Sequence, residues 1–172
     1  FALSFGFAFR DTQTLLNNTT PLLATGSDSN GVSRTSVLKF GQEYIKRDKK
    51  GASIGRSQFS LGTGLFDATV NDGSIPDGQF VSWLAQAQRL QKLGNDNLLI
   101  ARLDLQLTAN SLLSSKKFAI GGGKTLRGYR QNALYGDNGV YFSLEDRIAP
   151  KSKNGESNRV ESPALLYLRA IL

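Results

Sequence analysis

Large apolar residues alternate with small or polar ones along most of this chain, which is the pattern of β-strands with two chemically different faces. In residues 1–10 the large side chains share one face, and the small or polar ones share the other. The large set is Phe1, Leu3, Phe5, Phe7 and Phe9. Helical spacing would scatter these side chains around the axis, so the segment predicts a strand.

The same alternation predicts seven strands, separated by turns and loops rich in Gly, Asn, Asp and Ser. Strands are expected at about residues 1–10, 32–46, 52–66, 80–93, 98–108, 140–148 and 165–172. The segment 80–93 is ambiguous, because Leu84, Leu90 and Leu93 break the alternation and 85–93 alone could form a helix. We expect a strand there, since its neighbours are strands and residues 94–97 have the composition of a hairpin turn.

Charged residues on the polar face favour a membrane barrel over a soluble core. In 98–108 the leucines face one way, while Arg102, Asp104 and Gln106 face the other. Burying both charges in a soluble core would be costly, whereas a wet lumen accommodates them. No stretch approaches the roughly 18–20 apolar residues of a membrane-spanning helix. We therefore predict an all-β fold, an antiparallel transmembrane β-barrel segment of a bacterial outer membrane, with a soluble β-sandwich binding module as the alternative.

The predicted strand number is too small and odd for a closed barrel of one chain. Bacterial single-chain barrels have an even number of strands, about eight or more. An open sheet edge in lipid would also leave backbone groups unsatisfied. The chain contains no Met and begins at Phe1, inside a predicted strand. We expect residues 1–172 to be a partial barrel domain, completed by the remainder of the same protein.

Composition and charge argue against several functions. Cys and His are both absent, so a disulfide or a zinc, copper or haem site is not expected. Glu145 and Asp146 would lie on opposite faces of one strand, and Ser114-Ser115 has no His base. We therefore expect no enzyme activity and no cofactor. Basic loops and a basic lumen explain the net charge of +7. Nucleic-acid binding is not expected, because the one dense basic run, 46–50, falls in a predicted turn.

A glycine-rich connection at about 110–138 is the most informative part of the sequence. Its Gly123-Lys124-Thr125 is not a phosphate-binding loop, because that motif needs a glycine where Phe118 stands. Gly121, Gly122 and Gly123 permit positive φ angles and a close approach of the backbone. We expect these glycines to shape the loop rather than to bind a nucleotide.

Arg127 follows the glycine run in the sequence Leu126-Arg127-Gly128-Tyr129. An arginine at a loop tip is usually solvated. If this loop folds into the barrel, Arg127 could instead pair with a carboxylate in the lumen.

These residues resemble the (V/L)RG(Y/F) loop of the two-partner secretion transporters, haemolysin-activation proteins such as FhaC and ShlB within the BamA-like superfamily. The resemblance rests on Phe118-x-x-Gly121-Gly122 followed by Leu126-Arg127-Gly128-Tyr129. Gly139-x-x-x-Ser143-x-Glu145-x-Arg147 resembles the strand after that loop. The regions 76–93 and 106–115 also fit the family, especially its cyanobacterial members. The resemblance covers nearly the whole chain.

The resemblance implies a barrel of about sixteen strands, to which this chain contributes middle-to-late strands. Periplasmic POTRA domains would lie upstream of it. The glycine-rich loop would be the sixth extracellular loop and would fold back into the lumen. Arg127 would then dock against an Asp on the strand after 143–147, but residues 165–172 contain no Asp. Glu145 and Asp104 are candidate replacements, or the partner lies beyond residue 172.

The implied function is an outer-membrane translocation pore that exports an unfolded exoprotein in two-partner secretion. A BamA-like outer-membrane protein insertase and a small-solute porin are the alternatives. The expected partners are the secreted exoprotein, outer-membrane lipid and the remainder of the barrel. The expected functional residues are the loop residues Phe118, Gly121, Gly122, Gly123, Leu126, Arg127, Gly128 and Tyr129, and the lumenal strand residues Arg102, Asp104, Gln106, Ser143, Glu145 and Arg147.

Overall fold

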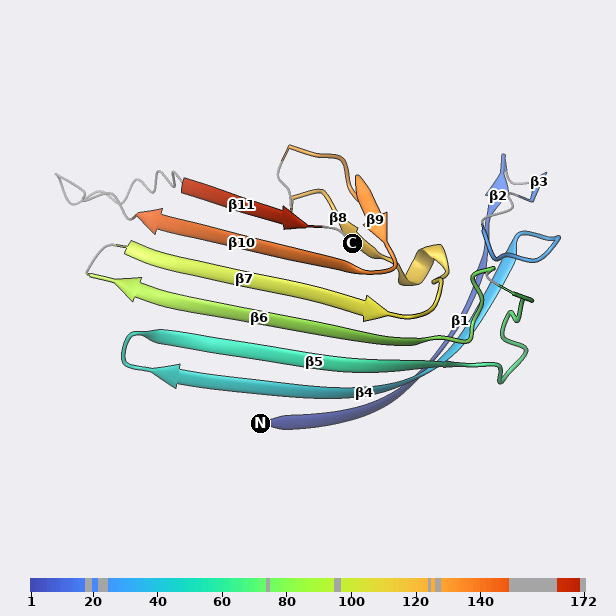
Figure 1. The fold of residues 1–172 in the computed structure, drawn as a ribbon, viewed down its shortest axis with the longest axis horizontal. Helices are drawn as coiled ribbons and strands as arrows, with labels where there is room; N and C mark the ends of the chain where they lie inside the picture. Colours follow the sequence, from blue (N-terminus) through green and yellow to red (C-terminus); the bar gives the residue numbers. More distant parts are fainter. Residues whose placement is uncertain are drawn as a thin grey trace.

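The computed structural model describes residues 1–17, 20–21, 25–73, 75–94, 97–123, 125, 128–148 and 164–170. Its main feature is a seven-stranded antiparallel sheet (Figure 1). Within this sheet, each strand pairs with the strand of the same sheet that follows it in the sequence. The strands are β1 (Ala2–Gln13), β4 (Val32–Asp48), β5 (Gly51–Thr63), β6 (Val81–Leu93), β7 (Asn97–Thr108), β10 (Gly139–Ile148) and β11 (Ala164–Ala170). A short hairpin of β2 (Leu15–Leu16) and β3 (Thr20–Pro21) follows β1.

All seven predicted strands are confirmed, including the ambiguous one at 80–93, although residues 171–172 of the last one lie outside the described residues. Val81–Leu93 forms a strand because β5 and β7 pair with it on both sides along most of its length. The prediction of a strand over 52–66 was too long, since β5 ends at Thr63. Phe66 and Asp67 both have φ of 57°, which is incompatible with an extended chain.

Among the described residues, no helix has the length and apolar character needed to cross a membrane.

The cross-strand register assigns every strand residue to one of two faces, because directly paired residues point the same way. We call the face covered by residues 109–138 the inward face, and the opposite one the outward face. The outward face is apolar and aromatic, as in the row Phe40, Phe59, Trp83 and Leu107. Phe5 and Phe7 on β1 remain 81% and 50% exposed. So large an uncovered apolar surface is expected of a membrane protein and not of a soluble sandwich.

From β1 to β10, the connections at the two ends of the sheet differ in length. The tight β4–β5 turn lies at one end, and the long connections 14–31, 64–80 and 109–138 lie at the other (Figure 1). At the long-loop end Val37, Phe80 and Leu112 form a small buried cluster. Asn71 Nδ2 donates hydrogen bonds to the carbonyls of Gly26 and Pro76, at 3.2 and 2.8 Å. These contacts join all three long connections into one layer.

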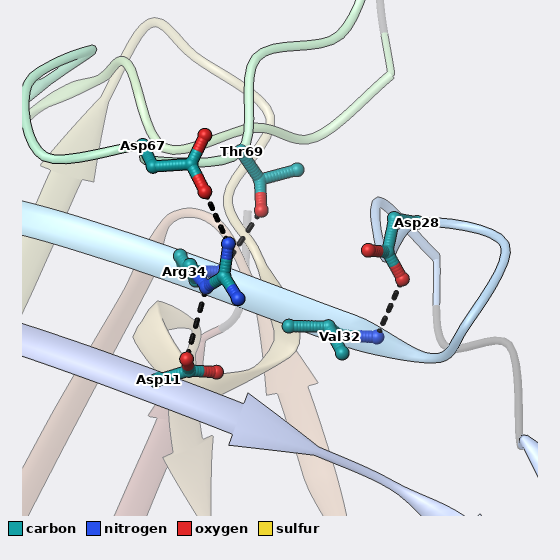
Figure 2. A network of polar contacts seen from close by, with 6 residues as sticks. All are labelled: Asp11, Asp28, Val32, Arg34, Asp67 and Thr69. Atoms are coloured by element: carbon teal, nitrogen blue, oxygen red, sulfur yellow. Dashed lines mark hydrogen bonds and ion pairs between the residues drawn. The ribbon is translucent and has the colours of Figure 1, made fainter.

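Arg34 on β4 fastens the connection after β5 to the sheet, as Figure 2 shows. Its guanidinium pairs with Asp11 of β1 at 2.9 Å and also with Asp67. The backbone N–H of Arg34 donates to Thr69 Oγ1 at 2.9 Å. Nearby, Asp28 Oδ1 accepts a hydrogen bond from the N–H of Val32 at 2.8 Å, which closes the turn before β4. The long-loop end is therefore held by polar contacts as well as by its apolar cluster.

Candidate functional site

The candidate site is the inward face of β7 and β10 together with the 109–138 connection, called here the inner loop. The register pairs Gly139 with Gln106, Tyr141 with Asp104, and Ser143 with Arg102. Glu145 and Arg147 continue the same face of β10. The structure thus brings together, on one face, the six strand residues expected to line a lumen. Whether they act on a substrate remains a prediction.

Gln106 holds both stems of the inner loop. Its side-chain amide nitrogen donates to the carbonyl oxygens of Lys116 and Asp137, at 3.1 and 3.0 Å. The side chain is buried, with 8% of the residue exposed. Nearby, the Asp137 carboxylate accepts the N–H of Leu112 at 3.0 Å and pairs with Lys117 at 3.2 Å. The Gln106 side chain on β7 therefore links the start of the inner loop to its end.

The inner loop has regular structure that the sequence alone did not predict. It contains a 3-10 turn, η1 (Ser114–Lys116), and a hairpin of β8 (Phe118–Ile120) and β9 (Leu134–Gly136). The strands of this hairpin have three residues each, too few for an alternation to be recognised. The hairpin folds back toward the start of β10 (Figure 1). There the ring of Phe118 lies against Gly139, where an added Cβ would be 2.2 Å from Phe118 Cδ1.

Two of the three consecutive glycines have the backbone conformation expected of them. Gly121 and Gly122 have φ of +133° and +89°. A Cβ on Gly121 would lie 2.3 Å from the carbonyl oxygen of Arg130, so no side chain fits there. Gly123 has neither a positive φ nor a neighbour within 4 Å of an added Cβ. The turn is closed by Thr125, whose hydroxyl accepts the N–H of Gly121 at 2.8 Å.

Tyr141 is the anchoring residue that the sequence analysis missed. Its hydroxyl donates to the carbonyl oxygen of Thr125 at 2.8 Å, and only 4% of the residue is exposed. The guanidinium of Arg102 lies 6.0 Å from the centre of its ring. Strict alternation on β10 places Tyr141 between Gly139 and Ser143 on the inward face, and that signal could have identified it. The tip of the glycine turn is thus fixed to the wall two residues before Arg127 in sequence.

Leu126 and Arg127 of the loop motif lie outside the described residues, so the predicted pairing of Arg127 is untested. Gly128 has φ of +88°, and Tyr129 is 59% exposed. The two candidate partners of Arg127 already make ion pairs. Asp104 is bound by Arg102 at 2.7 Å and by Gln86 at 3.0 Å, and Glu145 is bound by Arg147 at 2.6 Å.

Lys116 of the inner loop lies near two cations of the inward face. Burial lowers the pKa of Lys116, and the positive charges of Lys39 and Arg10 on the inward face lower it further. The Lys116 amine consequently binds its proton less tightly when the loop is docked than when the loop is released. Docking is therefore opposed by the charge of Lys116 at neutral pH, and it becomes more favourable as the pH rises through the lowered pKa.

Comparison with known proteins identifies the family. The family model described as haemolysin secretion/activation protein ShlB/FhaC/HecB matches residues 1–158. Among solved structures, CdiB from Escherichia coli has a similar fold, with a TM-score of 0.75 and 18% identity. That match covers 96% of this chain and 33% of the CdiB chain, so this chain spans about a third of the length of CdiB. No curated protein sequence matches it.

These comparisons agree with the geometry. The CdiB match assigns the open seven-stranded sheet to the wall of a β-barrel. The family is one of outer-membrane β-barrel transporters, which places the chain in the bacterial outer membrane. An apolar outward face and a polar inward face that carries a folded-in loop are what such a wall requires. Because the family model matches 158 of its 172 residues, this chain belongs to the ShlB/FhaC/HecB family of haemolysin secretion/activation proteins.

Proposed function

We propose that the protein containing this chain is an outer-membrane translocation pore that exports an unfolded exoprotein in two-partner secretion. Further strands of the same protein would complete the barrel, and the outward face would contact membrane lipid. The observation that carries the proposal is the inner loop, which is anchored by Gln106 and Tyr141 to the inward face of the wall. A loop held there occupies the path that a transported chain would take.

The inward face suits an unfolded polypeptide of any sequence. An extended chain carries one N–H and one C=O group for almost every residue, and these need hydrogen-bonding partners throughout transit. Amide and hydroxyl side chains supply both donors and acceptors. Those on the inward face of the described strands include Gln58, Ser60, Ser82, Gln86, Gln88, Gln106 and Ser143. Such a surface can solvate a passing backbone without retaining it.

Most charges on this face are neutralised in pairs. Arg56 binds Glu43 at 3.0 Å, in addition to the Arg102–Asp104 and Arg147–Glu145 pairs. Close opposite charges cancel at a distance, so a segment of either sign can pass these positions. Among the described residues, Arg10 and Lys39 of the inward face and Lys116 of the inner loop form a group of cations that make no ion pair.

We include the Leu126-Arg127-Gly128-Tyr129 motif in the proposed loop anchor. The hydrogen bond from Tyr141 to Thr125 supports this, because Thr125 directly precedes the motif in the sequence. No enzyme activity and no cofactor are part of the proposal, since hydrogen bonding and ion pairing suffice for transit.

The proposal predicts that export of the partner exoprotein requires the full-length protein. Cells that lack it should retain the exoprotein, and cells resupplied with it should release the exoprotein into the medium, as measured by immunoblotting of both fractions. Uptake of a small sugar across the outer membrane is measured in parallel. Unchanged export together with reduced sugar uptake in the deletion strain would identify a small-solute porin and refute the proposal.

A further inference from the structure

The end of β4 and the turn that follows it carry a basic cluster, called here the basic turn, that the proposed transport function does not use. Lys46, Arg47, Lys49 and Lys50 lie within five consecutive residues, and all four are exposed. The one acidic residue in this run, Asp48, forms an ion pair with Arg89 of β6, with 2.7 Å between Arg89 Nη1 and Asp48 Oδ2. Among the described residues, none of the four basic side chains makes an ion pair with a carboxylate. The turn therefore presents several uncompensated positive charges.

The lysines of this cluster lie at the edge of the outward face. Lys46 shares a cross-strand row with Ser53 and Arg89, next to the row that contains Tyr44. Lys49 and Lys50 form the turn itself. Short turns of outer-membrane barrels lie on the periplasmic side. This places the lysines at the level of the lipid headgroups in the periplasmic leaflet.

An apolar groove on the outward face leads away from the cluster. Its volume is about 320 Å³, its floor includes Gly55, Ala87 and Ala101, and Tyr44 and Phe142 form its sides. Arg89 lines the end nearest the turn. Further along the outward face, four residues beyond Gly55 on β5, lie the stacked rings of Phe59 and Trp83, 6.0 Å apart between ring centres.

The length of this surface matches one leaflet. Phe59 and Ser53 are six residues apart on β5, which corresponds to about 20 Å along the strand. With a tilt of about 40°, this distance spans about 15 Å of membrane depth, or half of the hydrocarbon core. A lipid whose phosphate lies at the lysines can therefore extend an acyl chain through the groove and onward over the apolar outward face to the aromatic pair.

We propose that the basic turn and the groove bind an anionic glycerophospholipid of the periplasmic leaflet. Its phosphate would lie among Lys46, Lys49 and Lys50, and one acyl chain would occupy the groove. Arg89 would not be the main phosphate ligand, because Asp48, Ser53 and Gln91 already engage its guanidinium. The net charge of the headgroup selects the lipid, since any phospholipid can supply the acyl chain. This site is separate from the inward face and does not depend on which substrate is exported.

The experiment uses the full-length protein reconstituted in bilayers that contain spin-labelled phosphatidylglycerol or spin-labelled phosphatidylcholine. Electron spin resonance gives the association constant of each lipid relative to the host lipid. The wild type should prefer phosphatidylglycerol. The triple variant K46Q/K49Q/K50Q should lose about tenfold or more of that preference, because each lysine near an anionic headgroup contributes roughly fivefold. The control R10Q/K39Q/K116Q removes the same charge from the inward side of the long-loop end and should keep the preference.

Several outcomes would overturn the proposal. They are equal association of both lipids with the wild type, an unchanged preference in the triple lysine variant, and an equal loss in the inward-face control. Millimolar glycerol phosphate in the buffer should not displace phosphatidylglycerol, and full displacement would mean that the turn binds soluble phosphate. The variant A87F fills the groove and should weaken association of both lipids. Unchanged association in that variant would exclude the groove from the site.

Discussion

Replacing Gly121 with valine is expected to release the inner loop from the barrel wall. The φ of +133° at this position is a conformation that a β-branched residue rarely adopts, at a cost of about 1–3 kcal/mol. The new side chain would also collide with the backbone, since its Cβ would lie 2.3 Å from the Arg130 carbonyl oxygen and 2.7 Å from the Ala133 nitrogen. The turn that presents Thr125 to Tyr141 could then not form. Limited proteolysis of the full-length protein should show the loop cut rapidly in G121V.

Two neighbouring glycines provide matched controls for this variant. Gly123 has an ordinary φ and open space around it, so G123V should leave the loop protected. Gly128 has φ of +88° but no atom within 4 Å of an added Cβ, so G128A tests backbone strain without a collision. An intermediate sensitivity is expected for G128A. A wild-type digestion pattern for G121V, or equal cleavage of G121V and G123V, would show that the turn does not hold the loop.

Replacing Gln106 with leucine is expected to loosen both stems of the inner loop together. Leucine has a similar size but no donor, so the carbonyl oxygens of Lys116 and Asp137 would lose a partly buried hydrogen bond each. A buried polar group left without a partner costs about 1–3 kcal/mol, which corresponds to about fivefold or more in the docked population. Hydrogen–deuterium exchange in the full-length protein should accelerate at both stems, near residues 116 and 137.

The control for Q106L is Q58L. Gln58 also lies on the inward face, but it donates to Ser60 Oγ within its own strand and not to the loop. Exchange at the loop stems should match the wild type in Q58L. If exchange accelerates at only one stem in Q106L, or if Q58L has the same effect, Gln106 does not hold both stems of the inner loop.

The anchors of the inner loop act on its backbone rather than on its side chains. Gln106 binds two carbonyl oxygens, and Tyr141 binds a third. Every loop sequence offers such carbonyl groups, so this docking places little constraint on most loop residues. Gly121 is an exception, since its position next to Arg130 excludes any side chain.

Much of the sheet could be predicted because apolar and polar residues alternate along strands that separate lipid from water. Residues such as Phe5 and Arg102 could each occupy only one side, and this fixes the faces of long strands. The end of β5 was missed because positive φ at Phe66 and Asp67 leaves no mark in the hydropathy pattern. The β8–β9 hairpin was missed because three residues cannot show a period.

The site was only partly predictable for a similar reason. Gln106 was expected on the inward face from its place in β7, but its partners are carbonyl oxygens, which sequence does not distinguish. Tyr141 was not predicted because an amphipathic tyrosine suits either face of such a strand, whereas the charges of Glu145 and Arg147 suit only the wet face. The partner of Arg127 stays a prediction. Contacts between distant segments depend on the curvature of the sheet, and alternation does not encode it.

Photo-crosslinking from two adjacent residues of β6 tests the central claim, that the inward face is the path of an exported polypeptide. Gln86 points inward and bonds to Asp104, whereas Ala87 lies on the outward face in the lipid-side groove. A photoreactive amino acid is placed at either position of the full-length protein while its exoprotein is being exported. We predict crosslinks to the exoprotein from position 86 and to lipid alone from position 87. Exoprotein crosslinks from position 87, or none from position 86 during active export, would contradict the account.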